Sequence, residues 1–173
     1  MITSAHQPII VQATKSAPMS ATKGAPSLTY VRRIRATPAK VWNAFVDPRE
    51  LVHWWGPDAG PTLSAETDVR VGGTFKIVFR TKGGERFESH GEYLELDPPR
   101  RLVMSFWFSV TPHLRSRVTV SIVAVAGGAE VTVQHDGFSD EGLPVTHEEG
   151  WKGALGKMAA RLESATEREE QGT

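Results

Sequence analysis

The sequence predicts an α+β protein in which a curved antiparallel sheet of about six or seven strands wraps around one long C-terminal helix, with two short helices after the first strand. Two observations lead to this prediction: roughly six runs alternate apolar and polar residues, and only one long helical segment follows them. Strands about 4.8 Å apart would present a face roughly 30 Å wide, but one helix covers only about 10 to 12 Å of it. The sheet should therefore curl, and the uncovered apolar wall should form a cavity or a partner surface.

The length of 173 residues suits one domain with a single buried core. Residues 1–27 show no hydrophobic period and are rich in Ala, Ser, Thr, Lys and Pro, which predicts a disordered leader. Met19 is an alternative start to Met1, because the residues after it lead directly into the folded part. We expect one folded domain over residues 28–168 and a disordered tail over residues 169–173.

The folded part is predicted to open with a strand over residues 28–36, followed by two short helices. Thr37 supplies an N-cap for the first helix, and Pro38 suits its first position. Asp47 and Glu50 then form an Asp-x-x-Glu capping box, which predicts a second helix that ends at a glycine-proline pair. Helices this short cannot cover a sheet, but they can plug one end of it.

The pattern then changes to period two, which predicts one antiparallel meander. Glycine pairs within residues 82–85 and 126–129 supply the positive φ that tight hairpins need. The parity of the apolar residues changes between Phe87 and Leu94, so we expect a bulge or bend near Gly91. Apolar side chains share faces of these strands at Phe75, Ile77, Phe79, Met104, Phe106, Phe108, Val118, Val120, Ile122, Val131 and Val133.

The last helix is predicted to open at Gly150-Trp151, announced by a capping box over residues 146–149. Its apolar stripe consists of Trp151, Leu155, Met158 and Leu162. The helix also contains three glycines, and each costs about 1 kcal/mol relative to alanine in a helix interior. Gly153 and Gly156 project opposite the apolar stripe, so we expect solvent or a loop there, with a second subunit as the alternative.

Short motifs follow one another in a specific order along the chain. They are Arg32-x-Ile34-x-Ala36-x-Pro38-x-x-Val41-Trp42, Trp54-Trp55-Gly56-Pro57, Asp68-x-Arg70-Val71-Gly72-Gly73, Gly91-x-Tyr93-x-Glu95, Arg101-Leu102-Val103, Val118-Thr119, His135-x-Gly137-Phe138 and Gly150-Trp151. In this order they resemble the activator of heat-shock chaperone ATPase homologue-like family, within the START and birch-pollen-allergen superfamily (SRPBCC). The resemblance implies a helix-grip, START-like fold with a cavity. It implies no particular reaction, because similar members include chaperone activators, polyketide cyclases and drug-binding resistance proteins.

Composition argues against several classes of function. Twenty basic and twenty acidic side chains balance, which predicts neither a nucleic-acid binder nor a membrane-surface binder. The chain has no cysteine, so disulfides and thiolate metal sites are excluded, and the apolar runs are too short to span a bilayer. The histidines show no ligand spacing that would support a metal site. We expect a cytoplasmic protein without membrane insertion and without a cofactor.

The candidate binding residues are the apolar side chains of the predicted cavity wall, together with one histidine. They are Trp54, Trp55, Phe75, Ile77, Phe79, Met104, Phe106, Phe108, His135, Trp151 and Leu155. Trp54 and Trp55 are consecutive and cannot both face the same way, so we expect one to cap the core and the other to border the cavity mouth. His135 shares the inward parity of Val131 and Val133, where an imidazole can protonate or orient a ligand carbonyl. A core histidine satisfied by a neighbour is the interpretation we favour.

Three functional hypotheses follow. The leading one is a module that binds a small hydrophobic or aromatic molecule between the sheet and the last helix, held mainly by apolar burial. The alternative is a cyclase or hydrolase-type enzyme on the same cavity, with His135 as acid or base; His135→Ala would abolish turnover and leave binding. A chaperone partner is the least favoured, because the chaperone activator carries a further N-terminal domain that residues 1–27 cannot supply. The sequence leaves a homodimer open.

Overall fold

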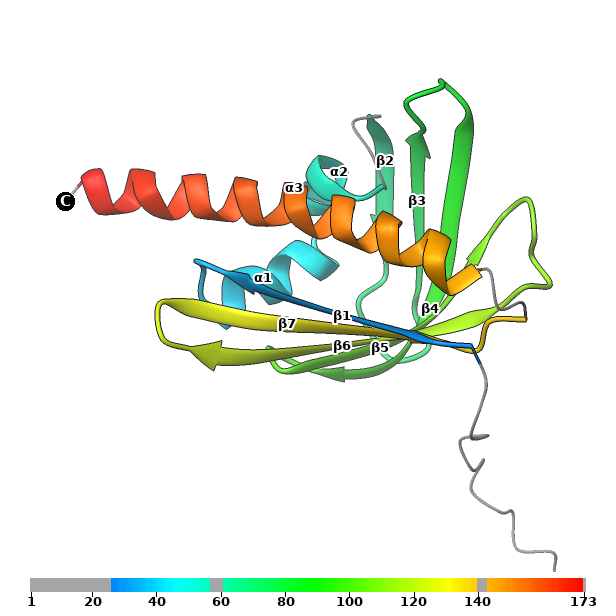
Figure 1. Cartoon of the computed structure of the whole chain (residues 1–173), viewed down its shortest axis with the longest axis horizontal. Coiled ribbons are helices and arrows are strands. Elements are labelled where there is room, and N and C mark those ends of the chain that lie inside the picture. The colour runs from blue at the N-terminus through cyan, green and yellow to red at the C-terminus, as the bar shows by residue number, and fades with distance from the viewer. Residues whose placement is uncertain (1–25, 57–60, 140–142, 173) are drawn as a thin grey trace, which may run out of the picture.

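The computed structural model describes residues 26–56, 61–139 and 143–172 and confirms the predicted helix-grip fold (Figure 1). Within these residues, seven strands form one antiparallel sheet in the order β1-β7-β6-β5-β4-β3-β2. The sheet bends strongly, and the three helices lie on its inner side (Figure 1). The strands are β1 (Leu28–Ile34), β2 (Thr62–Thr67), β3 (Thr74–Arg80), β4 (Arg86–Asp97), β5 (Arg101–Phe108), β6 (Ser116–Val125) and β7 (Gly128–Asp136); the helices are α1 (Pro38–Val46), α2 (Pro48–Trp54) and α3 (Leu143–Gln171).

Both predicted short helices are present, and each begins at a side-chain cap followed by proline. Thr37 Oγ1 accepts a hydrogen bond from the backbone N–H of Lys40 at 3.3 Å, which caps α1. Asp47 Oδ1 accepts one from the backbone N–H of Arg49 at 2.8 Å, which caps α2. These bonds satisfy backbone donors that have no partner within the helix itself.

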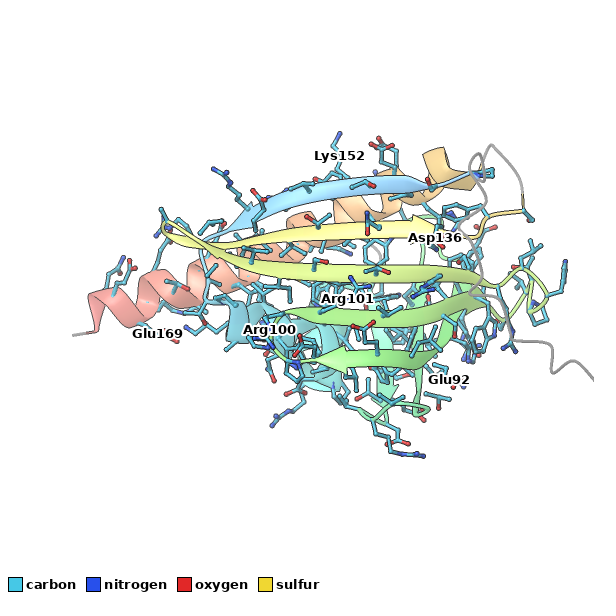
Figure 2. All side chains as sticks on the ribbon, turned by 90° about the horizontal axis from the view of Figure 1, so that it is seen from below. Glu92, Arg100, Arg101, Asp136, Lys152 and Glu169 are labelled. Atoms are coloured by element: carbon cyan, nitrogen blue, oxygen red, sulfur yellow. The ribbon has the colours of Figure 1, made fainter. Side chains whose placement is uncertain are left out.

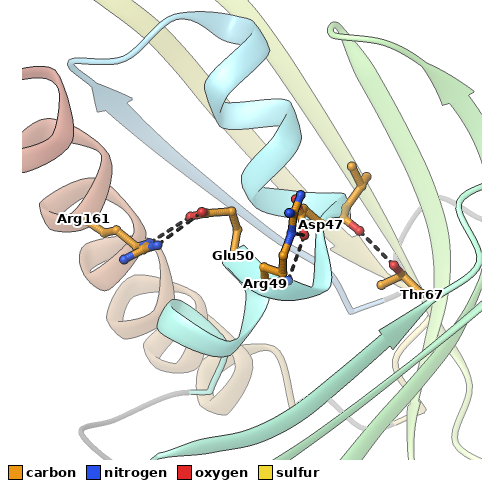
Figure 3. A network of polar contacts seen from close by, with 6 residues as sticks. Asp47, Arg49, Glu50, Thr67 and Arg161 are labelled. Carbon is orange, nitrogen blue, oxygen red and sulfur yellow. Dashed lines mark hydrogen bonds and ion pairs between the residues drawn. The ribbon is translucent and has the colours of Figure 1, made fainter. Parts of the chain in front are cut away.

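The capping box predicted for α2 is only half formed, because Glu50 does not reach back to its own helix start. Its carboxylate instead accepts two hydrogen bonds from the Arg161 guanidinium of α3, at 2.8 and 3.2 Å (Figure 3). These bonds hold the pKa of Glu50 below its usual value. The hydroxyl of Thr67 on β2 donates to the Val46 carbonyl at 3.0 Å, so polar contacts tie the short helices to both α3 and the sheet (Figure 3).

A bulge lies in β4 close to the predicted position. The pairing of β4 with β5 shifts by one residue and leaves Leu94 as the extra residue, three positions after Gly91. Gly91 has a different role. A Cβ atom there would lie 2.1 Å from the Ser105 carbonyl oxygen and 2.2 Å from the Phe75 ring. The glycine therefore lets the Phe75 ring pack directly on the backbone of β4.

The core lies between the inner face of the sheet and the helices. Trp54 of α2 and Leu155 and Met158 of α3 are among its fully buried side chains. The indole N–H of Trp54 donates to the Ala44 carbonyl of α1 at 2.8 Å, so this large side chain is buried without an unpaired donor.

The outer face of the sheet carries charged side chains, as Figure 2 shows for Glu92 and Arg101, and Arg100 lies in the turn between β4 and β5. Arg100 pairs with Asp97 at 2.9 Å, and Arg101 pairs with Glu95 at 3.0 Å. These pairs are well exposed to solvent, so each contributes little to stability. Arg100 and Arg101 are therefore each paired with a neighbouring acid.

The start predicted for the last helix is wrong. Helix α3 begins at Leu143, so residues 146–149 lie inside its first two turns and do not form an N-terminal capping box. The same residue spacing occurs within helices, and sequence alone does not separate the two cases. At the other end α3 runs to Gln171, so most of the tail predicted over residues 169–173 is helical. The predicted leader lies outside the described residues up to residue 25.

Gly156 offers a test of the glycine-rich face of α3. A Cβ atom at this position would meet nothing within 4 Å, so alanine fits without a clash. We expect Gly156→Ala to raise the free energy of unfolding by about 1 kcal/mol, because glycine loses more backbone entropy than alanine on entering a helix. Urea denaturation would measure the change. Gly91→Ala is the opposite control and should destabilise, and an equal loss in both variants would contradict the open environment of Gly156.

Candidate functional site

A cavity of about 250 Å³ lies where the first turns of α3 and the end of α2 face β3, β4 and β5. It occupies inner sheet surface that the helices leave uncovered. The residues that line it are Trp54, Trp55, Gly56, Phe79, Thr81, Phe87, Ser89, Phe106, Phe108, His147, Gly150, Trp151 and Ala154. Its wall is therefore mostly aromatic, with small residues on α3.

The aromatic rings of the wall contact one another. The Trp55 ring centroid lies 5.8 Å from that of Trp151 and 6.3 Å from that of Phe106. On the sheet, the rings of Phe79 and Phe87 stack with centroids 5.9 Å apart and planes 19° apart. Contacts of this kind hold each ring in place, so the wall is largely preformed.

Both consecutive tryptophans are buried and line the cavity. The indole of Trp54 donates to α1, whereas the Trp55 indole N–H donates to Ser89 Oγ at 3.1 Å on the sheet. The two indole rings thus point in different directions, as expected for consecutive residues. The expected division into one core cap and one mouth residue is not seen, because both belong to the wall and to the core cluster.

The structure divides the predicted site residues into two groups. Those that line the cavity are Trp54, Trp55, Phe79, Phe106, Phe108 and Trp151. Those that are buried in the core without lining it are Phe75, Ile77, Met104, His135 and Leu155. Alternation identified the inner face of each strand correctly. It could not show where on that face the helices and Trp55 already pack.

Sequence reasoning missed several wall residues. They are Gly56, Thr81, Phe87, Ser89, His147, Gly150 and Ala154. A signal for two of them existed, since Phe87 and Ser89 share the inward parity of β4. Gly150 and Ala154 lie one helical turn apart on α3, which places two small side chains on one patch of the wall.

Two residues of the sheet wall, Ser89 and Thr81, carry hydroxyl groups. Ser89 is fully buried, and its Oγ accepts the hydrogen bond from Trp55. Thr81 Oγ1 is buried and has no hydrogen-bond partner among the described residues. Nearby, the half-buried His147 ring lies 4.9 Å from the Phe138 ring. A buried hydroxyl without a partner is unusual in a folded protein.

His135 lies beside the cavity and is fully buried. Its Nδ1 accepts a hydrogen bond from the Trp151 indole at 3.1 Å, so we assign the proton to Nε2, which donates to Ser116 Oγ at 2.7 Å. The Ser116 hydroxyl in turn donates to the Phe106 carbonyl at 3.2 Å.

Burial, with a smaller contribution from the nearby His147, lowers the pKa of His135 to about 3. The imidazole is therefore neutral near pH 7, and both ring nitrogens are engaged within the protein. This is the arrangement of a core histidine satisfied by its neighbours, the interpretation favoured above over an acid-base role. Within residues 26–56, 61–139 and 143–172, no group of three or more His, Asp or Glu side chains is placed to hold a metal ion.

Comparison with known families identifies the chain. The family described as Activator of Hsp90 ATPase homolog 1-like protein matches residues 35–163, which include α1, α2, six of the seven described strands and most of α3. The chain belongs to this family. The resemblance drawn from the sequence motifs, and the START/SRPBCC superfamily that it implied, are thereby confirmed. No curated protein matches the chain significantly.

Solved structures of similar proteins support the same fold. Protein CV1439 from Chromobacterium violaceum is 28% identical, with a TM-score of 0.70 over 79% of this chain and 96% of that one. An AHSA1-like protein from Aeromonas hydrophila is 25% identical, with a TM-score of 0.67, and the match covers 81% of this chain and 94% of that one. CalU16 from Micromonospora echinospora is also 25% identical, with a TM-score of 0.60, and the match covers 84% of this chain and 82% of that one.

In the part of the chain that the structure describes, no helix has the length and apolar character needed to cross a membrane.

Proposed function

We propose that the protein binds a small, flat, mainly apolar molecule in the cavity between the curved sheet and α3. The aromatic-lined cavity of about 250 Å³ is the observation that supports this function. A dry cavity of about 150 Å³ accommodates one benzene ring, so this cavity suits a molecule of about two rings. Affinity would come chiefly from apolar burial, at about 25 cal/mol per Å² removed from water.

The small residues of the wall also support this function. Ordinary core packing would fill such a space with a larger residue than Ala154 or Gly150, both of which border it.

Ala154→Phe tests this function directly. A phenyl ring at this buried wall position would occupy about 150 Å³ of the cavity and leave too little room for two rings. We expect naphthalene affinity to fall at least about tenfold, because most of the apolar contact area is lost. Binding can be followed by tryptophan fluorescence, since Trp54, Trp55 and Trp151 line the cavity.

Ala160→Phe is the matched control, because it makes the same change on the same helix at an exposed position. It should bind naphthalene as the wild type does. Equal binding by a folded Ala154→Phe protein would overturn the proposed site.

The class of the natural ligand needs a separate experiment. Native mass spectrometry of the wild-type protein purified from its own host, with a search for a defined extra mass, would identify it.

The enzymatic alternative with His135 as acid or base gains no support from the site. An acid or base has to reach its substrate, but His135 does not line the cavity and both of its ring nitrogens are bonded within the protein. With a pKa of about 3, the His135 imidazole is neutral near pH 7 and cannot act as an imidazolium acid. We therefore propose binding rather than turnover, and family membership by itself supplies no chaperone partner.

A further inference from the structure

We propose that His135 is a positioning residue of the ligand site, whose imidazole holds the Trp151 indole in the cavity wall and out of the cavity itself. This inference rests on the proposed function and specifies which buried group shapes that site. His135 is fully buried and does not line the cavity, whereas Trp151 does. It therefore acts through Trp151 and does not touch the ligand.

The three tryptophans of the cavity wall all have their indole N–H groups paired within the protein. Trp54 and Trp55 donate to groups on α1 and β4, at 2.8 and 3.1 Å. Trp151 donates to His135 Nδ1 on β7 at 3.1 Å, a bond that joins α3 to the sheet. An indole has one donor and no acceptor, so none of the three rings has a donor left for the cavity.

The hydrogen bonds around His135 run in one direction. The Phe106 carbonyl can only accept, so the Ser116 hydroxyl donates to it at 3.2 Å and accepts from His135 Nε2 at 2.7 Å. Nδ1 is then the nitrogen without a proton, which is the acceptor that the Trp151 indole requires. The imidazole thus connects strands β5, β6 and β7 to a wall residue on α3.

Ring contacts fix the imidazole in turn. The His135 ring centroid lies 4.4 Å from that of Phe138 and 5.4 Å from that of Phe106. Its strand, β7, is paired on both sides, with β1 and with β6. An acceptor held in this way restricts the rotation of the indole bound to it, so His135 sets the position of the Trp151 ring.

Loss of the acceptor would change the cavity. The Trp151 indole is 6% exposed, and a buried N–H donor without an acceptor is destabilising. Because this ring borders the cavity, it has space to rotate into once the bond to His135 is gone. A ring turned in that direction occupies volume that the ligand needs, so binding should weaken although no ligand contact has been removed.

His135→Leu and His135→Asn test this role, because the two side chains share a branched shape and differ in their polar atoms. The Asn side-chain oxygen stands where Nδ1 stands in histidine and can accept from the indole, which Leu cannot do. We expect His135→Leu to weaken naphthalene binding about tenfold and His135→Asn to stay within about threefold of the wild type. Tryptophan fluorescence would measure each affinity.

A Trp151→Phe background separates positioning from core packing. Phenylalanine has no N–H to be held, so His135→Leu and His135→Asn should bind naphthalene equally well when combined with Trp151→Phe. A difference between leucine and asparagine that persists without the indole would show that His135 does not act through Trp151, and would overturn the inference.

The outcomes for this inference and for the proposed function are distinct. If the wild type binds naphthalene, and the leucine variant binds as well as the wild type or as well as the asparagine variant, His135 is not a positioning residue and the proposed function stands. If the wild type does not bind naphthalene, both fail. Should His135→Leu not fold, His135→Phe keeps a ring without an acceptor and should show the same tenfold loss; wild-type affinity in that variant would overturn the inference.

Discussion

Leu155→Ala is expected to lower the free energy of unfolding by about 3 to 5 kcal/mol. Leu155 is fully buried on α3 and belongs to the main cluster of buried side chains, but it does not line the cavity. The truncation removes apolar surface from the core and leaves a void that close-packed neighbours fill only in part. The effect should therefore appear in stability rather than in ligand contact.

Urea denaturation of Leu155→Ala would measure the loss, and naphthalene binding to the same folded variant would show whether the cavity is affected. Leu63→Ala is the matched control, because Leu63 is 47% exposed on the edge strand β2 and should cost less than about 1 kcal/mol. A small loss of stability with a large loss of affinity would make Leu155 a cavity residue, as the sequence alone had predicted, and would contradict its place in the core.

His135 should make the protein about 2 kcal/mol less stable at pH 5 than at pH 7. The pKa of a histidine side chain is ordinarily about 6.5, and that of His135 is about 3 in the folded protein. The unfolded state therefore binds more protons in this range, and stability rises with pH. The contribution of His135 to the free energy of unfolding is complete above the pKa of the unfolded state. It is lost progressively as the pH falls from about 6.5 towards 3.

The physical cause is that folding buries the neutral imidazole between the sheet and α3. The titratable group that faces it is His147 of α3, whose charge would further disfavour protonation of His135. Its hydrogen-bond partners, Ser116 and Trp151, are uncharged near pH 7. No carboxylate contributes to the pKa shift among the described residues, so nothing there compensates a buried imidazolium.

Urea denaturation of wild type and His135→Gln at pH 7, 6 and 5 would measure this contribution. The variant should lose less stability than the wild type over the same range, by about the 2 kcal/mol attributed to His135. His113→Gln, at an exposed position, should follow the wild type. Parallel pH profiles for wild type and His135→Gln would show that the imidazole is not held neutral by burial.

Local signals in the sequence were sufficient for most of the fold. Thr37 and Asp47 cap the short helices as predicted, because a cap depends only on residues a few positions away. The change of parity after Phe87 correctly indicated a bulge in β4. The start of α3 was misplaced because residues 146–149 have the spacing of a cap and also suit a helix interior, and only the hydrogen-bonded backbone distinguishes the two.

The candidate site was predicted less completely, for a geometric reason. Period two along β3 placed Ile77 and Phe79 on the inner face alike, yet Phe79 lines the cavity and Ile77 does not. Which of them is covered depends on where α2, α3 and the Trp55 ring come to rest. Those contacts join residues far apart in the chain, so no pattern within one strand encodes them.

The sequence by itself determined which residues are apolar, their strand or helix period and hence a curved sheet around one long helix, because these properties are carried by neighbours along the chain. Only the tertiary structure decided that His135 is sealed between Trp151 and Ser116, and that Phe79 but not Ile77 lines the cavity. The burial of a side chain and its hydrogen-bond partners are decided when segments distant in the chain pack together. This packing determines which of the inward-facing side chains form a site.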